Sequence, residues 1–271
     1  VKAKNLRWDR WFKCGLCEQH YHGVVRCALG WACWKTYLGR LETDMARIMA
    51  MNVLGGGLHG AGHHEDELSV READLATQRR NGASVTRIYI AQSALASTYQ
   101  MLERHEEALR LRRDVYSAYL RTHGEEDRNT LLEACNHTLS LLALKHFEEA
   151  KSLMRKTVPV ARRVLGEGNE VTLRIRWNYA AALCQDASAT LDDLREGVTT
   201  LEDAARTARR VLGGAYPITV GIETCLRGAR ATLHARETGD MSAIREAVEA
   251  LTTGAGHPRV RREAVEALNS L

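Results

Sequence analysis

Cysteine and histidine residues are concentrated near the start of the chain, in a pattern that could bind zinc. The candidate ligands are Cys14, Cys17, Cys27 and either His20 or His22. A Cys-x-x-Cys pair can supply two thiolates to one zinc ion, and two more ligands would complete a tetrahedron. However, residues 24–37 have a helical pattern, which restricts where Cys27 can lie. A complete local site, a site whose other ligands precede Val1, and no metal therefore all stay open.

The sequence gives weaker evidence for other kinds of site, namely a second metal cluster, a phosphate-binding loop and a catalytic site. His63-His64-Glu65 has the composition of a metal cluster, but similar residues recur as His105-Glu106 and as His146-Phe-Glu148. Recurrence at a fixed spacing indicates a structural turn. Gly55-Gly-Gly57 lacks the lysine of a phosphate-binding loop. Since no arrangement of nucleophile, base and orienting group can be proposed, we predict no catalytic residues and no enzymatic activity.

A repeat of about 42 residues organises the elements that must position these side chains. Residues 94–109 return in similar form as residues 136–151, and Gly82, Gly124 and Gly166 follow one another at 42-residue intervals. A period of this size is typical of stacked helix pairs, each packing on its neighbours. The sequence predicts an all-α, right-handed solenoid of about five helix pairs, with a closing helix over residues 258–271.

Charged residues follow the same repeat. Acidic residues begin the second helix of each unit and arginines end it, which is the order that the helix dipole favours. The net charge of +4 is spread along the chain, so we expect no nucleic-acid partner. No apolar run approaches the roughly 20 residues needed to span a bilayer, so we expect no membrane partner either. A small-molecule substrate is not expected, and no cofactor is expected beyond the zinc considered above.

The repeats resemble tetratricopeptide repeats of the kinesin-light-chain type. The resemblance rests on Leu95-Ala-Ser-Thr-Tyr99, on Glu106-Glu-Ala108, and on Leu212-Gly-Gly-Ala-Tyr-Pro-Ile-Thr219 at a unit boundary. It covers roughly residues 43–260. It implies a scaffold or adaptor that binds a peptide or a partner protein in a concave groove.

Transferring the repeat positions places one set of side chains on the concave side of each first helix. The expected groove residues are Asn52, His59, Ser93, Ser97, Gln100, Cys135, Leu139, Arg174, Trp177 and Gln185. With a single arginine, this set argues against a preference for acidic peptides. Trp177 is either a binding hot spot or a packing residue between units, and both interpretations stay open.

The N-terminal segment resembles the end of a RING-CH-like zinc finger. Cys14 and Cys17 match its closing ligand pair, and Trp8 or Trp11 matches a tryptophan that precedes them. The earlier ligands of such a finger would lie before Val1. This resemblance implies an alternative function, in which the repeats are the substrate-binding part of a RING-type ubiquitin ligase.

The sequence therefore predicts two parts, a Cys/Trp-rich segment over residues 1–42 and a repeat domain over residues 43–271. The chain begins with Val1 rather than Met, so we expect further residues upstream. Cys135, Cys184 and Cys225 are scattered at helical positions and fit small buried side chains. Because a helical solenoid has little need of disulfides, we expect a reducing compartment and a cytoplasmic location.

Overall fold

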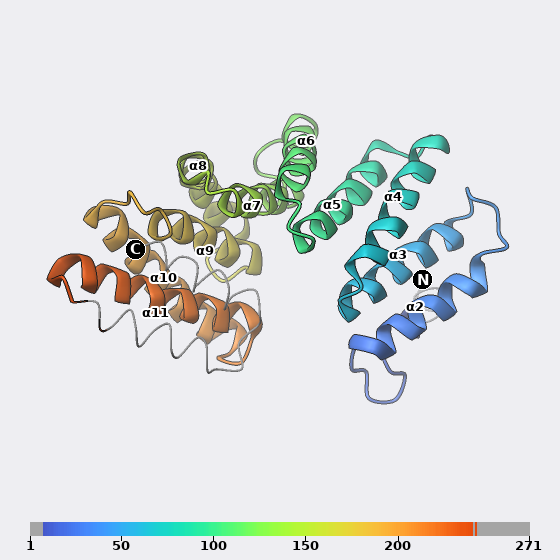
Figure 1. The fold of residues 1–271 in the computed structure, drawn as a ribbon, viewed down its shortest axis with the longest axis horizontal. Helices are drawn as coiled ribbons and strands as arrows, with labels where there is room; N and C mark the ends of the chain where they lie inside the picture. Colours follow the sequence, from blue (N-terminus) through green and yellow to red (C-terminus); the bar gives the residue numbers. More distant parts are fainter. Residues whose placement is uncertain (1–7, 241, 243–271) are drawn as a thin grey trace. The chain divides into compact units, whose positions relative to one another are not determined.

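The computed structural model describes residues 8–240 and 242, and within this range the chain is almost entirely helical (Figure 1). The ten helices of this range are α2 (Gly23–Tyr37), α3 (Met45–Ala61), α4 (His64–Arg80), α5 (Val85–Met101), α6 (His105–His123), α7 (Arg128–Ala143), α8 (Phe147–Leu165), α9 (Glu170–Cys184), α10 (Leu191–Leu212) and α11 (Pro217–Thr238). β-structure in the described range is limited to one isolated bridge between Lys13 and His20. The all-α prediction is confirmed.

The helices follow the predicted repeat. The pairs α3–α4, α5–α6, α7–α8 and α9–α10 occupy the first four predicted units, and α11 begins at Pro217, where the fifth was expected. Helix α2 confirms the helix predicted over residues 24–37. The closing helix predicted over residues 258–271 lies outside the described residues. No helix in the described part of the chain combines the length and the apolar character needed to cross a membrane.

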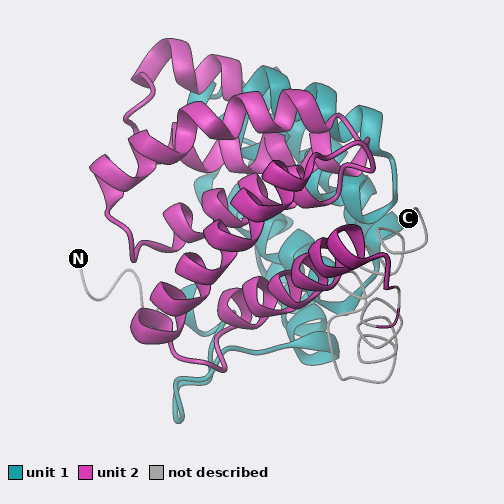
Figure 2. Cartoon of the chain, turned by 90° about the vertical axis from the view of Figure 1, so that its left-hand side faces the viewer, with its two compact units in different colours: residues 1–115 teal, residues 116–271 magenta. Residues whose placement is uncertain are grey.

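Two compact units make up the chain, Val1–Val115 and Tyr116–Leu271, hereafter unit 1 and unit 2 (Figure 2). The boundary falls inside α6, within the predicted repeat domain. The predicted division between residues 1–42 and 43–271 stays a prediction.

Local signals explain where the helices begin and end. Asp44, Asp127 and Asn169 precede α3, α7 and α9, and the side chain of each accepts a hydrogen bond from a backbone N–H in the first turn. Such caps satisfy donors that have no partner inside the helix. The periodic glycines Gly82, Gly124, Gly166 and Gly213 have φ angles of 59°, 81°, 83° and 89°. Glycine adopts this conformation without a steric penalty, which accounts for their regular spacing.

Each unit has its own buried clusters. In unit 1 the N-terminal segment packs on α2 and α3, where Trp11, Cys33, Tyr37, Ala50 and Val53 form one cluster. The ring of Trp8 stacks on Tyr37 at a centroid distance of 5.2 Å. In unit 2 one cluster joins α7, α8 and α9, and another joins α9, α10 and α11. Successive helices therefore share their cores, as in a repeat protein.

Candidate functional site

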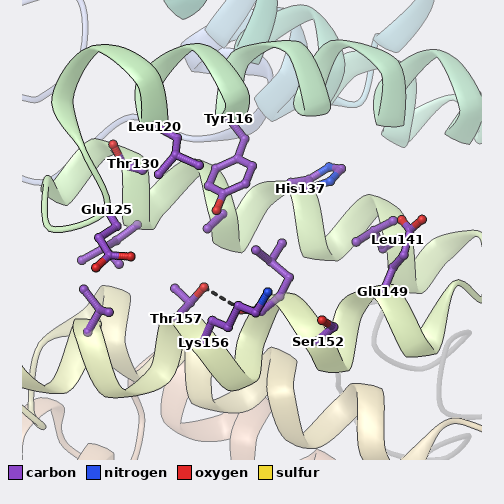
Figure 3. A pocket seen from close by; sticks show the side chains of 14 residues that line it. Tyr116, Leu120, Glu125, Thr130, His137, Leu141, Glu149, Ser152, Lys156 and Thr157 are labelled. Atoms are coloured by element: carbon purple, nitrogen blue, oxygen red, sulfur yellow. Dashed lines mark hydrogen bonds between the residues drawn. The ribbon is translucent and has the colours of Figure 1, made fainter.

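A cavity of about 440 Å³ lies within unit 2, between α7, α8 and the part of α6 that begins at Tyr116 (Figure 3). Its apolar walls are formed by Leu120, Leu131, Ala134, Leu141, Leu153 and Val160. This volume is large enough for one bulky side chain or a small molecule. The cavity is therefore a candidate binding site of the described structure.

Helical periodicity brings these side chains together. On α8 the lining residues Glu149, Ser152, Leu153, Lys156 and Val160 recur at steps of three and four. Residues at these steps share one face of a helix. The lining residues of α7 follow the same rule, so the two helices turn matching faces toward the cavity.

Polar groups sit at both ends of the cavity and along one side. Figure 3 shows Glu125 at one end, Glu149 and Ser152 at the other, and Lys156 along the α8 side. The fringe therefore carries two carboxylates and one ammonium group. A ligand with an apolar body and a polar or basic end would match this distribution.

Tyr116 and Thr130 add polar groups to the apolar walls. The ring of Tyr116 stacks on that of His137 at a centroid distance of 5.9 Å. Burial, together with the negative charge of Glu125, raises the pKa of the Tyr116 hydroxyl, which therefore stays neutral and can donate a hydrogen bond. Thr130 is 2% exposed, and its buried hydroxyl has no hydrogen-bond partner among the described residues. Buried polar groups without a hydrogen-bond partner are rare in folded proteins. A ligand atom that forms a hydrogen bond with the Thr130 hydroxyl would therefore be stabilised here.

Three of the predicted groove residues contact an arginine of their own helix pair. Asn52 on α3 accepts a hydrogen bond of 3.1 Å from Arg71 on α4. Ser93 and Ser97 on α5 accept bonds of 2.8 and 2.7 Å from Arg112 on α6. Arg71 and Arg112 are themselves 9% and 4% exposed. These hydrogen bonds join the two helices of each pair, and the three side chains stay half-buried. Binding of a partner by them stays a prediction.

The other two predicted groove residues of unit 1 differ from each other. The side chain of His59, in the last turn of α3, is 44% exposed and lies 3.0 Å from a carboxylate oxygen of Glu67. Gln100 is 8% exposed, and its amide nitrogen is buried without a partner in the described part of the chain. A partner could therefore reach His59, whereas Gln100 is enclosed by its own fold.

Two predicted groove residues of unit 2, Cys135 and Trp177, pack against neighbouring helices. Cys135 is 2% exposed and accepts a hydrogen bond from Asn178. The indole of Trp177 lies against Gly221 of α11, where an added Cβ would collide with the ring. The indole therefore packs between helices, and a role for the half-buried Trp177 in binding a partner stays a prediction.

Leu139, Arg174 and Gln185 complete the predicted set. Leu139 lies on α7 and is half-buried, and Gln185 is the half-buried C-cap of α9. Arg174 is 46% exposed and pairs with Glu170 at 2.8 Å. Binding of a partner by Arg174 stays a prediction.

Cys14 and Cys17 lie on a short hairpin. The backbone N–H of Cys14 donates to the carbonyl of Gln19, and that of Tyr21 donates to Phe12. Backbone hydrogen bonds from Cys17 and Leu16 lower the pKa of the Cys14 thiol. Within the described residues, however, no third Cys, His or carboxylate group joins these two cysteines as a metal-binding cluster. Zinc binding by this pair stays a prediction.

The cavity was not predicted from the sequence, although the sequence of α8 carries one signal of it. Apolar and small residues on α8 recur at steps of three and four, which indicated a buried face. The pattern could not show that part of this face lines a cavity. Whether a cavity forms depends on the spacing between neighbouring helices, which is a tertiary property.

Comparisons with known proteins agree on the fold. No model of a protein family matches the sequence, and no curated protein matches it. BtubC (BKLC) from P. vanneervenii has a similar crystal structure, with 15% sequence identity over 91% of this chain and 89% of that chain, and a TM-score of 0.56.

A second similar structure is that of a Podosopora anserina protein, described as a kinesin light chain with nearly identical TPR-like repeats. It is 19% identical, covers 82% of this chain and 97% of that chain, and has a TM-score of 0.59. These comparisons do not support the RING-CH-like resemblance of the N-terminal segment. They show that the chain has an all-helical fold of TPR-like repeats.

Proposed function

We propose that the chain is a protein-interaction scaffold that holds a segment of a partner protein in the unit 2 cavity. Structures with TPR-like repeats fit such a role, because stacked helix pairs offer extended surfaces to partners. The cavity between α6, α7 and α8 is the observation that carries the proposal. Its walls are formed by packed helices, so binding would cost little ordering entropy.

The chemistry of the cavity indicates what kind of segment fits. An apolar side chain of the partner would fill the space between Leu131, Leu153 and Val160. A polar atom next to that side chain could pair with the hydroxyl of Thr130, which lacks a partner in the described chain. Glu125 and Glu149 on the fringe favour a basic residue in the same segment. We therefore expect a peptide with a bulky apolar anchor and a neighbouring Lys or Arg.

Selection from a random peptide library displayed on phage, using the whole chain as bait, tests this proposal. The dissociation constants of selected peptides are then measured by fluorescence anisotropy. Ser152 is exposed at the fringe of the cavity, so Ser152→Trp can block the entrance without disturbing the core. We expect this change to weaken the selected peptides by at least about tenfold, which is about 1.4 kcal/mol.

Matched variants separate the cavity from other surfaces. Arg163→Trp places the same bulky side chain on α8 outside the cavity, at a residue that is 63% exposed. Arg174→Ala alters the groove surface that the sequence predicted. The proposal requires that both leave the affinity unchanged. Loss of binding in Arg174→Ala together with normal binding in Ser152→Trp would place the partner on α9 and overturn the cavity assignment.

A further inference from the structure

Two histidines and a glutamate meet at the turn between α3 and α4. Nδ1 of His59 lies 3.0 Å from Oε2 of Glu67, and Nδ1 of His64 lies 3.3 Å from the same oxygen. Ligand atoms of all three residues lie within 4.8 Å of one another. We propose that His59, His64 and Glu67 form a binding site for a divalent transition-metal ion of the zinc class.

The helical hairpin holds the ligands in register. His59 is in the last turn of α3, while His64 and Glu67 are in the first turn of α4. The connecting Gly62 has a φ angle of 78°, and the backbone N–H of His63 donates to Leu58 at 3.0 Å. This tight turn brings residues of both helices to one point. The site is therefore built on rigid elements, as a metal site requires.

The repeat itself does not explain the cluster. The turn residues Gly62, Glu103 and Lys145 all have positive φ angles and align the first three helix pairs. Counted from these residues, Glu67 stands where the next pairs have Ala108 and Ala150, each 0% exposed. Among these three pairs, a buried carboxylate thus replaces a small apolar residue only in the first.

The same alignment applies to the histidines. His59 stands where the next pairs have Gln100 and Leu142, and His64 where they have His105 and Phe147. His64 therefore recurs once, as expected of a turn residue, but the full set of three ligands occurs only in the first pair among these three. A structural role for the turn does not account for His59 and Glu67.

Neighbouring residues orient the carboxylate. Glu67 is 1% exposed, and its other oxygen, Oε1, lies 3.5 Å from Nε of Arg71. Arg71 is held in turn by Asn52, and Gly55 leaves room for its guanidinium, since a Cβ there would lie 2.6 Å from Cζ. Outer contacts of this kind fix a ligand in place and tune its metal. The positive charge of Arg71 repels a metal ion, so the two imidazoles must supply much of the affinity of the site for the ion.

The ligand types select the class of metal. Two imidazole nitrogens and one carboxylate oxygen suit Zn²⁺, Ni²⁺, Co²⁺ or Cu²⁺, whereas Ca²⁺ and Mg²⁺ prefer sites made of oxygen alone. Three protein ligands leave a fourth position for water or for a side chain of a partner. The 44% exposure of the His59 side chain gives an ion a route in from solvent.

Binding of Co²⁺ and Zn²⁺ to the whole chain, first stripped of metal with EDTA, tests the proposal. Co²⁺ is followed by its visible absorption, and Zn²⁺ by isothermal titration calorimetry. We expect one equivalent of each ion to bind, without the intense near-ultraviolet band of a cobalt thiolate. His59→Ala and His64→Ala should each weaken binding by at least about tenfold, because each removes one of three ligands.

Two controls make the test specific. His63→Ala removes an exposed histidine beside the cluster, and Cys14→Ser with Cys17→Ser removes the thiol pair. The proposal requires that both leave the affinity unchanged. Because the side chain of His59 is exposed, we expect the His59→Ala protein to fold. If circular dichroism shows that this variant is unfolded, His59→Gln is used in its place. Absence of a bound equivalent, binding that survives both histidine changes, or binding lost with the cysteines would each overturn the site.

Discussion

Asp74 on α4 and Asp186 after α9 show how differently this fold treats two enclosed carboxylates. Asp74 is 2% exposed, and burial raises its pKa despite a hydrogen bond from Gln78 and the charge of Arg71. The side chain of Asp186 is 11% exposed, and burial pushes its pKa upward as well. For Asp186, however, hydrogen bonds from Ser188 and from Lys151 at 2.9 Å outweigh burial and lower the pKa. The two residues should therefore give opposite pH dependences.

We predict that Asp74→Asn gains stability relative to the parent protein as the pH rises. Because the folded pKa of Asp74 is raised, its contribution is fully present below the ordinary value of 3.8 and is lost as the pH rises through the folded pKa. The difference in free energy of unfolding, parent minus variant, should therefore fall as the pH rises above about 3.8. Urea unfolding at a series of pH values measures it. A difference that is independent of pH, or that grows with pH, would contradict the prediction.

Asp186→Asn serves as the matched change with the opposite sign. Its folded pKa is lowered, so its contribution is present above 3.8 and is lost as the pH falls through the folded pKa. The variant leaves the enclosed Lys151 with Glu148 as its remaining carboxylate partner in the described structure. We expect a loss of about 1.5–3 kcal/mol at pH 7, the usual contribution of a hydrogen bond to a charged group. The same urea series should show this loss shrinking below pH 3.8, and a loss that persists there would contradict the assignment.

At the level of the element, the turn between α7 and α8 contains a residue under backbone strain. Lys145 has a φ angle of 59°, and its side chain is exposed. The N–H of His146 donates to Leu141 at 2.9 Å, which closes the helix end around this left-handed residue. The corresponding position before α4 is Gly62, which adopts the same conformation without penalty. The second and third pairs therefore carry a strain that the first pair avoids.

We predict that Lys145→Gly stabilises unit 2 by about 0.5–1 kcal/mol, because relief of the left-handed conformation exceeds the added chain entropy of glycine. Lys145→Ala is the matched control, since it removes the long side chain but keeps the Cβ that causes the strain. Thermal unfolding followed by circular dichroism should show a higher Tm for the glycine variant and no increase for alanine. Equal gains in both variants would mean that the Lys145 side chain, not the backbone, is responsible.

Much of the architecture could be predicted from the sequence because its signals are local. The glycines at 42-residue intervals marked the ends of helix pairs, since only glycine adopts the required φ without cost. The helix predicted over residues 24–37 and the start of α11 at Pro217 also followed from local patterns. These features depend on a few neighbouring residues, so no knowledge of tertiary contacts was needed.

The candidate sites depend on contacts between helices, and there the sequence was less informative. Asn52 and Ser93 were predicted to lie in the groove, but the sequence did not show that Arg71 and Arg112 reach across each helix pair and donate hydrogen bonds to them. The sequence shows which residue types are present, but it does not show toward which helix each arginine side chain points. Likewise, adjacent residues in the sequence suggested His63-His64-Glu65 as a cluster, whereas the side chains that meet in space, His59, His64 and Glu67, come from both sides of a turn.

At the scale of the whole molecule, the seven cysteines occur in both units, and the burial of each thiol depends on how the surrounding helices pack. Cys33 in unit 1 is buried, and burial raises the pKa of its thiol to about 11. In unit 2 burial likewise raises the pKa of Cys184, and Cys135 is 2% exposed. Cys14 has a lowered pKa, and Cys17 is exposed. Because the thiolate is the reactive form, the thiols should differ widely in reactivity.

We predict that iodoacetamide at neutral pH modifies Cys14 and Cys17 first, and reaches Cys33, Cys135 and Cys184 only after unfolding. Peptide mass spectrometry over a time course gives the rate at each cysteine, and the same reaction in guanidinium chloride provides the control in which all rates converge. Modification of Cys33 as fast as Cys14 would mean that the packing of α2 on α3 opens readily. Early modification of Cys184 would mean the same for the core shared by α9, α10 and α11, because each thiol is protected only by the helices that cover it.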